Sequence, residues 1–194
     1  MRGLKAYTDR AILTFLVFVG LIMTASVKDD TLTTDEGLYL PTGIRIWMDG
    51  NIRLGFEHPP LMRDLAALPI ILYLDMKPPS EFVDAKNPDL NNEVWSFGDR
   101  YIYAQNESPE VVLLVGRLPA ILLTLAFIFF VYVAIKQRYG ESAGALTAVV
   151  MALSPFILAH GRLATLDVPT GAASFVMIYA LAQFLTKGDN RSMV

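Results

Sequence analysis

Carboxylates stand at two distant points of the chain, each beside a long apolar segment. Asp35 and Glu36 form an adjacent pair in TTDEGLYL after the first segment, and Asp167 lies in GRLATLDV directly before the last one. A carboxylate near the low-dielectric edge of a membrane can serve as a general base or bind a cation. Each also has a structural interpretation, because Thr33 or Thr34 can cap a helix that begins with the acidic pair, and Asp167 can cap the helix that follows it. The residue types leave both interpretations open.

Two arginines and a histidine accompany these carboxylates. Arg117 lies at the start of the second apolar segment, and Arg162 lies between the third and the fourth. A guanidinium there can extend toward lipid head groups, or its planar donor fork can bind a phosphate. His58 precedes Pro59 and Pro60, which fix the chain direction, so it can be a hydrogen-bonding strut. No glycine-rich phosphate loop, HExxH or GxSxG motif is present, so nucleotide-cleaving and hydrolase functions lack their usual support.

Apolar segments of membrane-spanning length must position these side chains. The chain has 194 residues, 54% of them hydrophobic and 18% charged, whereas soluble domains average about 25% charged. A helix needs about 17 to 25 apolar residues to cross a bilayer. We therefore predict an all-α integral membrane protein with four transmembrane helices. The predicted spans are residues 11–27, 111–135 (clearest from 118), 142–159 and 168–185.

The flanks of the spans predict their orientation. Lys and Arg in short flanks favour the cytoplasmic side, and they occur in residues 1–10, 136–141 and 186–194. We therefore predict a multi-pass plasma (inner) membrane protein with both termini cytoplasmic, and with residues 28–110 and 160–167 outside. The first span has an alternative interpretation as a signal peptide, because it follows basic residues and ends in small residues that resemble a cleavage site.

The long outside loop contains most of the acidic residues and a predicted surface helix. From Leu61 to Leu74 the apolar residues follow a helical period, but the run is too short to span and contains Pro69. We therefore expect interfacial helices in this loop. The stretch from Lys77 to Asn92 is rich in Pro, Asp and Asn and indicates a surface excursion.

Composition excludes several other classes. The chain contains no cysteine, which rules out a disulfide framework, a cysteine metal site and a thiolate nucleophile. The net charge of -3 argues against a nucleic-acid partner, because such proteins present a concentrated basic face.

The order of the motifs resembles the N-terminal part of membrane glycosyltransferases of the GT-C fold. The likeness is to the family that contains protein O-mannosyltransferases and the bacterial lipid A aminoarabinose transferase. It covers nearly the whole chain and runs through TDEGLYLPTGIRIWMDGNIRLGFEHPPLMRDLAALPI, FGDRYIYAQN, VGRLPAILL and SPFILAHGRLATLDVPTGAASF. The resemblance implies a partial GT-C fold and transfer of a sugar from a polyprenyl or dolichyl phosphate to a hydroxyl of a protein, lipid or glycan. Transfer would occur on the outer face with inversion.

The same resemblance implies roles for individual residues. Asp35 matches the acidic position at the catalytic centre, where it would act as general base; Glu36 completes the pair, and Asp167 matches the acidic position of the second outside loop. The expected substrate-binding residues are Tyr39, His58, Arg117 and Arg162, with the arginines near the carrier phosphate. Those arginines, or a divalent metal ion held by Glu36 and Asp167, would stabilise the departing phosphate. Family members differ in metal dependence, so both possibilities stay open.

Length separates the chain from this family. Relatives typically have eleven or more spans, so we expect this chain to be the N-terminal part of an enzyme whose C-terminal part is a further partner. The alternative function is a non-catalytic four-span scaffold, or a truncated remnant, whose outside loop binds another protein.

Overall fold

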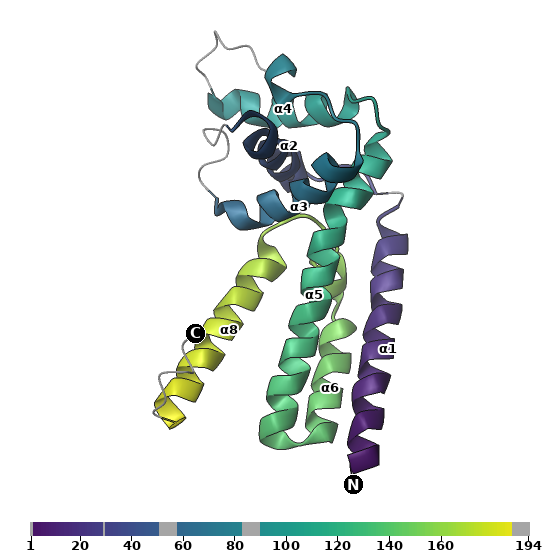
Figure 1. The fold of residues 1–194 in the computed structure, drawn as a ribbon, viewed down its shortest axis with the longest axis vertical. Coiled ribbons are helices and arrows are strands. Elements are labelled where there is room, and N and C mark those ends of the chain that lie inside the picture. The colour runs from purple at the N-terminus through teal and green to yellow at the C-terminus, as the bar shows by residue number, and fades with distance from the viewer. Residues whose placement is uncertain (1, 29, 51–57, 83–89, 188–194) are drawn as a thin grey trace.

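The computed structural model describes residues 2–28, 30–50, 58–82 and 90–187, and within these ranges it contains helices and no strand. The shorter helices α2, α3 and α4 gather at one end, and the longer helices extend from them, with the N-terminus at the far end of α1 (Figure 1). We call the assembly of α2, α3, η1 and α4 the cap. The elements are α1 (Arg2–Ser26), α2 (Thr34–Asp49), α3 (Pro60–Tyr73), the 3-10 helix η1 (Pro79–Phe82), α4 (Leu90–Tyr103), α5 (Pro109–Tyr139), α6 (Glu141–Ala152), α7 (Pro155–His160) and α8 (Asp167–Lys187).

Three helices among the described residues are long and apolar enough to cross a membrane. They are Tyr7–Ser26 in α1, Pro109–Tyr139 in α5 and Asp167–Thr186 in α8. These helices contain the second and fourth predicted spans, and all of the first except Val27. Together they support a multi-pass, all-α membrane protein.

The third predicted span, residues 142–159, is not one continuous helix, and that prediction is corrected here. α6 ends at Ala152 and α7 begins at Pro155. Proline lacks an amide hydrogen and its fixed φ suits the first position of a helix, so it begins a new helix here. α6 turns back along α5 after Gly140, whose φ of 95° is in the left-handed region (Figure 1).

The packing of α6 on α5 is close because Gly144 lies at the contact. A Cβ atom at this position would stand 2.9 Å from the carbonyl oxygen of Tyr132. On the other side, the α1 residue Asp9 accepts hydrogen bonds from Tyr132 and Lys136 of α5. Apolar residues fill the space between these three helices: Ile12, Leu16, Val19, Met23, Ile121, Ile128, Tyr132, Ala148 and Ala152.

The cap has its own core, built around α2. The predicted helix at Leu61–Leu74 is present as α3, Pro60–Tyr73, and it begins at the second proline of the HPP sequence. Its place at a membrane surface stays a prediction. α2 and α4 cross so closely that a Cβ atom on Gly98 would lie 1.7 Å from the carbonyl oxygen of Gly37. Of the predicted surface excursion, residues 77–82, which include η1, and residues 90–92 are within the described ranges.

Candidate active site

The acidic pair opens α2 through a capping box. Thr33 is the N-cap, and its hydroxyl accepts a hydrogen bond from the backbone N–H of Glu36 at 3.4 Å. The Glu36 carboxylate in turn accepts from the backbone N–H and the hydroxyl of Thr33, at 3.2 and 2.9 Å. These reciprocal bonds satisfy donors at the helix start and place two carboxylates in its first turn. Glu36 is buried, whereas its neighbour Asp35 is exposed.

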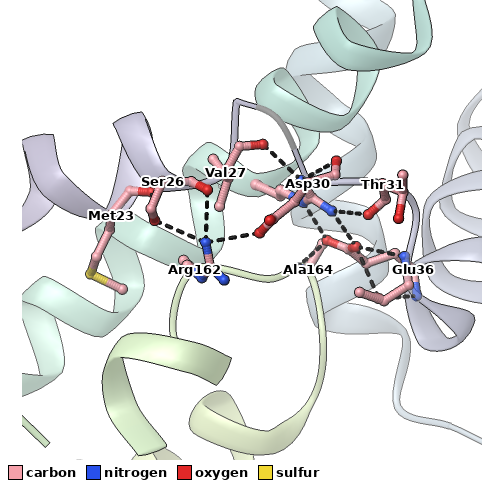
Figure 2. A network of polar contacts seen from close by, with 10 residues as sticks. Met23, Ser26, Val27, Asp30, Thr31, Glu36, Arg162 and Ala164 are labelled. Carbon is pink, nitrogen blue, oxygen red and sulfur yellow. Dashed lines mark hydrogen bonds and ion pairs between the residues drawn. The ribbon is translucent and has the colours of Figure 1, made fainter. Parts of the chain in front are cut away.

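Arg117 of α5 forms a buried ion pair with Glu36. Its Nε and Nη2 atoms donate to the two carboxylate oxygens, each at 2.8 Å. The other hydrogen bonds run from Nη1 to the carbonyl oxygens of Val27 at 3.1 Å and Asp30 at 3.3 Å, and from Nη2 to that of Thr31 at 2.9 Å (Figure 2). A guanidinium has five N–H donors, so these contacts use the whole donor set.

The partners of Glu36 keep its carboxylate charged. Burial by itself raises the pKa of Glu36, but the hydrogen bonds and charge of Arg117, with the bonds from Ala164 and Thr33, outweigh it and leave the pKa below its ordinary value. The Ala164 backbone N–H, in the loop before α8, donates to this carboxylate at 3.0 Å. One carboxylate therefore ties α2 to α5 and to the loop between α7 and α8.

Arg162 forms the second half of this network. Its Nη1 atom donates to the carbonyl oxygen of Ser26 and to the Ser26 hydroxyl, both at 2.9 Å, and lies 2.8 Å from the Asp30 carboxylate (Figure 2). We call the set Asp30, Glu36, Arg117 and Arg162 the polar junction. It joins the end of α1, the start of α2, α5 and the loop before α8.

Asp167 begins α8 and is paired with a histidine from α7. The ring nitrogen Nδ1 of His160 lies 3.0 Å from Oδ2 of Asp167, and the Thr165 hydroxyl donates to the same oxygen at 3.2 Å. The ring of Phe156 packs on His160, with 4.7 Å between ring centroids. The Asp167 and His160 side chains are 46% and 42% exposed, so this pair is accessible from outside the protein.

Tyr39 connects the two acidic positions. Burial raises the pKa of Tyr39, and the charges of Asp35 and Asp167 raise it further, while Arg63 acts in the opposite direction. The negative charges of Asp35 and Asp167 thus act on the same phenol. The Tyr39 ring also meets His58 edge to face, with 5.5 Å between centroids. The candidate site therefore draws Asp35 and Tyr39 from α2, His58 from the chain before α3, and Asp167 from the start of α8.

An apolar groove leads from the membrane helices toward this group. It encloses about 890 Å³ between α5 and α8, and a smaller adjoining hollow of about 330 Å³ reaches Pro59 and Leu166. The groove is lined by Leu61, Met62, Leu123, Ala126, Phe127, Phe130, Pro169, Ala172, Ala173, Val176, Met177, Ala180 and Leu181. Pro59 and Leu166 are the chain neighbours of His58 and Asp167, so the hollow ends beside the candidate site.

Glu36 and Asp167 are the expected metal ligands, and metal binding by them stays a prediction. The described residues contain no group of three His, Asp or Glu side chains placed to hold a metal ion. Glu36 is bonded to Arg117, Thr33 and Ala164. A hard cation normally needs several oxygen ligands, so we assign it no step.

Three residues of the site were not among those expected from the sequence. Asp30 is the partner of Arg162, His160 is the partner of Asp167, and Arg63 of α3 is buried within electrostatic range of Tyr39. In HGRLATLD, His160 stands seven residues before Asp167. This spacing indicates a contact only if one helix ends at His160 and the next begins at Asp167, as α7 and α8 do. Nothing in the local sequence pairs Arg162 with Asp30, because all the elements from α2 to α7 lie between the two residues in the chain.

Comparison with known proteins adds one finding. Residues 110–194 match the family model described as dolichyl-phosphate-mannose-protein mannosyltransferase. No curated protein and no solved structure matches the chain. The matched segment runs from α5 to α8 and contains Arg117, His160, Arg162 and Asp167, while Asp35 lies outside it. The match supports a membrane glycosyltransferase family of the GT-C type for this chain.

Proposed function

We propose that this chain forms the catalytic face of a glycosyltransferase that moves a sugar from a polyprenyl or dolichyl phosphate to a hydroxyl acceptor outside the membrane. The observation that carries the proposal is the 3.0 Å hydrogen bond from the backbone N–H of Ala164 to Glu36, because it ties the neighbour of Asp35 to the loop that leads into Asp167. The two acidic positions provide polar groups where α2 meets the start of α8, next to long apolar helices. The family match of residues 110–194 supports the reaction class.

The groove between α5 and α8 supports a lipid-linked donor. Its lining is aliphatic and aromatic, and its upper end adjoins Pro59 and Leu166. An isoprenoid chain in this groove would remain in an apolar environment while its phosphate reached the polar face beside His58 and Asp167. A water-soluble nucleotide sugar would gain nothing from such a lining.

In the proposed reaction, Asp35 acts as the base. Its exposed carboxylate takes the proton of the acceptor hydroxyl as that oxygen forms a bond to the anomeric carbon. The bond between this carbon and the phosphate oxygen breaks on the opposite side, and the phosphate leaves with the electron pair. The configuration at the anomeric carbon is therefore inverted. Glu36 and Arg117 position Asp35, because their ion pair fixes the first turn of α2, which contains Asp35.

The two arginines have different parts in this proposal. Arg117 holds the protein together, since its five donors are already bonded to Glu36 and to carbonyl oxygens. Arg162 uses Nη1 for Ser26 and Asp30, and no residue of the described ranges bonds its Nε or Nη2. Arg162 thus retains donors for the carrier phosphate.

The test is Asp35→Asn in membranes of cells that express the gene's complete product, supplied with radiolabelled polyprenyl-phosphate mannose. Loss of a general base lowers kcat by about 10²- to 10⁴-fold. Asp49→Asn is the matched control, because Asp49 ends the same helix and faces Arg45. Undiminished transfer by Asp35→Asn would refute the base role. A chain that shows no saturable donor binding and copurifies with another membrane protein would support the scaffold alternative.

A further inference from the structure

The reaction proposed above assigns no proton transfer or substrate contact to His160, the partner of Asp167. Nδ1 of His160 is 3.0 Å from Oδ2 of Asp167, a hydrogen-bond distance between residues of α7 and α8. An ionised carboxylate can only accept hydrogen bonds, so Nδ1 must be the donor. A neutral imidazole has one N–H, and the other nitrogen is then an acceptor. In the neutral form of His160, Asp167 therefore selects the tautomer in which Nε2 carries a lone pair.

Two further contacts fix the pair. The Thr165 hydroxyl donates to the same Asp167 oxygen at 3.2 Å, and Thr165 itself is buried. Phe156 packs on the imidazole ring at a centroid distance of 4.7 Å and an interplanar angle of 33°. The carboxylate and the ring are thus both held from a second side. Groups that are held before a ligand arrives bind it with a smaller loss of conformational entropy.

The acceptor nitrogen of His160 is available to a ligand. The His160 side chain is 42% exposed, and no residue of the described ranges forms a hydrogen bond with Nε2. Asp167 lies within electrostatic range of Tyr39, and Leu166 lines the hollow that joins the groove. The pair therefore borders the same polar face as Asp35.

We propose that His160, oriented by Asp167, binds a substrate hydroxyl through Nε2. A lone-pair acceptor that receives no hydrogen bond from the described residues is complementary to an O–H group, and hydroxyls are present on both the sugar of the donor and the acceptor alcohol. The proposal rests on the proposed function for the identity of these substrates. Asp167 then acts through His160 as a positioning residue. The alternative is a purely structural role, in which His160 only bonds Asp167 at the start of α8. In that case a ligand would not affect Nε2.

The first experiment reads the tautomer by nitrogen NMR on the chain in detergent. The chain contains two histidines, so ¹⁵N-histidine labelling gives two sets of signals, and His58→Gln assigns them. We expect His160 to carry its proton on Nδ1. Asp167→Ala removes the acceptor and should abolish this preference, whereas Thr165→Val, the matched control, should keep it. A wild-type His160 with its proton on Nε2 overturns the proposal without reference to any activity.

The second experiment adds ligands to the same labelled chain. A short-chain polyprenyl-phosphate mannose should shift the His160 Nε2 signal if the sugar supplies the hydroxyl, and the same polyprenyl phosphate without sugar should not. A serine- and threonine-containing peptide should shift it if the acceptor supplies the hydroxyl. If the mannolipid binds saturably and neither ligand moves the Nε2 signal, the hydroxyl role is refuted. If the mannolipid does not bind, the proposed function fails. The tautomer experiment still tests whether Asp167 orients His160.

Transfer assays on the complete gene product separate binding from local structure. His160→Asn keeps an N–H donor near the Nδ1 position and loses the Nε2 acceptor, whereas His160→Gln has the opposite arrangement. Loss of one substrate hydrogen bond is expected to raise KM for the hydroxyl-bearing substrate about tenfold in His160→Asn. Full activity of His160→Asn would show that the bond to Asp167 is all that matters and would overturn the proposal.

Discussion

Arg117 and Glu36 form the most completely satisfied charged contact in the described part of the chain. Both side chains are fully buried, and their charges are compensated by each other and by backbone groups. Breaking a buried pair from one side leaves an uncompensated charge, which costs far more than the pair contributes. We therefore propose that the two residues belong to the architecture of the site and that Arg117 positions Asp35, whereas phosphate binding by Arg117 stays an untested prediction.

Arg117→Lys tests this role. Lysine retains the charge but has three donors in place of five and cannot match the carboxylate with a planar fork. We expect a loss of about 3 kcal/mol in the free energy of unfolding, which is typical of a disrupted buried pair. Thermal or denaturant unfolding in detergent measures it. Arg138→Lys, at an exposed position of the same helix, is the control and should change stability by less than about 0.5 kcal/mol. Equal effects of the two substitutions would contradict the role.

Glu36 also gives the fold a pH dependence of defined sign. Its pKa is lower in the folded chain than its ordinary value, so the folded state holds the proton less tightly than the unfolded state does. The stabilisation is complete above the ordinary pKa of about 4.3 and disappears as the pH falls through the folded value. We expect unfolding temperatures in detergent to fall with acidification below about pH 4. Glu36→Gln should have a shallower acid dependence, and an unchanged slope would count against the ion pair.

At the scale of elements, the crossing of α2 and α4 depends on two glycines. A Cβ atom on Gly98 would overlap the Gly37 carbonyl oxygen, so Gly98→Ala must push the helices apart. We expect a destabilisation of about 1 to 3 kcal/mol, the usual range for overpacking. Gly171→Ala in α8 is the control, since a Cβ atom there has no neighbour within 4 Å and alanine favours a helix. Unfolding midpoints should fall in the first variant and hold or rise in the second.

The predictable elements were those whose evidence is local. Hydrophobic length was enough to predict the helices α1, α5 and α8, and helical periodicity with two leading prolines was enough to predict α3. The break between α6 and α7 was missed because apolar length alone does not distinguish one span from two shorter helices. Pro155, which begins α7, is the local signal for this break.

The site was less predictable than the helices that carry it. Asp35 and Asp167 were identified by type and by their place next to apolar segments, and Thr33 was a correct candidate for the cap. The pairing of Glu36 with Arg117 joins residues 81 positions apart, and burial of both is a tertiary property. Local sequence therefore specified which groups carry charge, while packing determined which of those charges remain accessible.

For the whole molecule, the distribution of basic residues predicts which end of the helices faces the cytoplasm. The cap should be outside, and the turn between α5 and α6 should be inside. The chain has no cysteine, so single cysteines can be introduced without a background. Tyr103→Cys in the cap and Tyr139→Cys at the turn replace exposed side chains. In intact cells, a membrane-impermeant maleimide should label the first and spare the second until the membrane is opened. The reverse pattern would invert the topology.

The polar junction also restricts how this protein can be recombined with its relatives. Residues 110–194 are the part that matches a family model, yet Arg117 in that part is bonded to Val27, Asp30, Thr31 and Glu36, which lie outside it. A chimera that exchanges only residues 110–194 would combine α5 of one protein with the acceptors in residues 27–36 of the other. A functional chimera should therefore need residues 27–36 and α5 from the same parent. The exchangeable unit then consists of two segments that are separate in sequence.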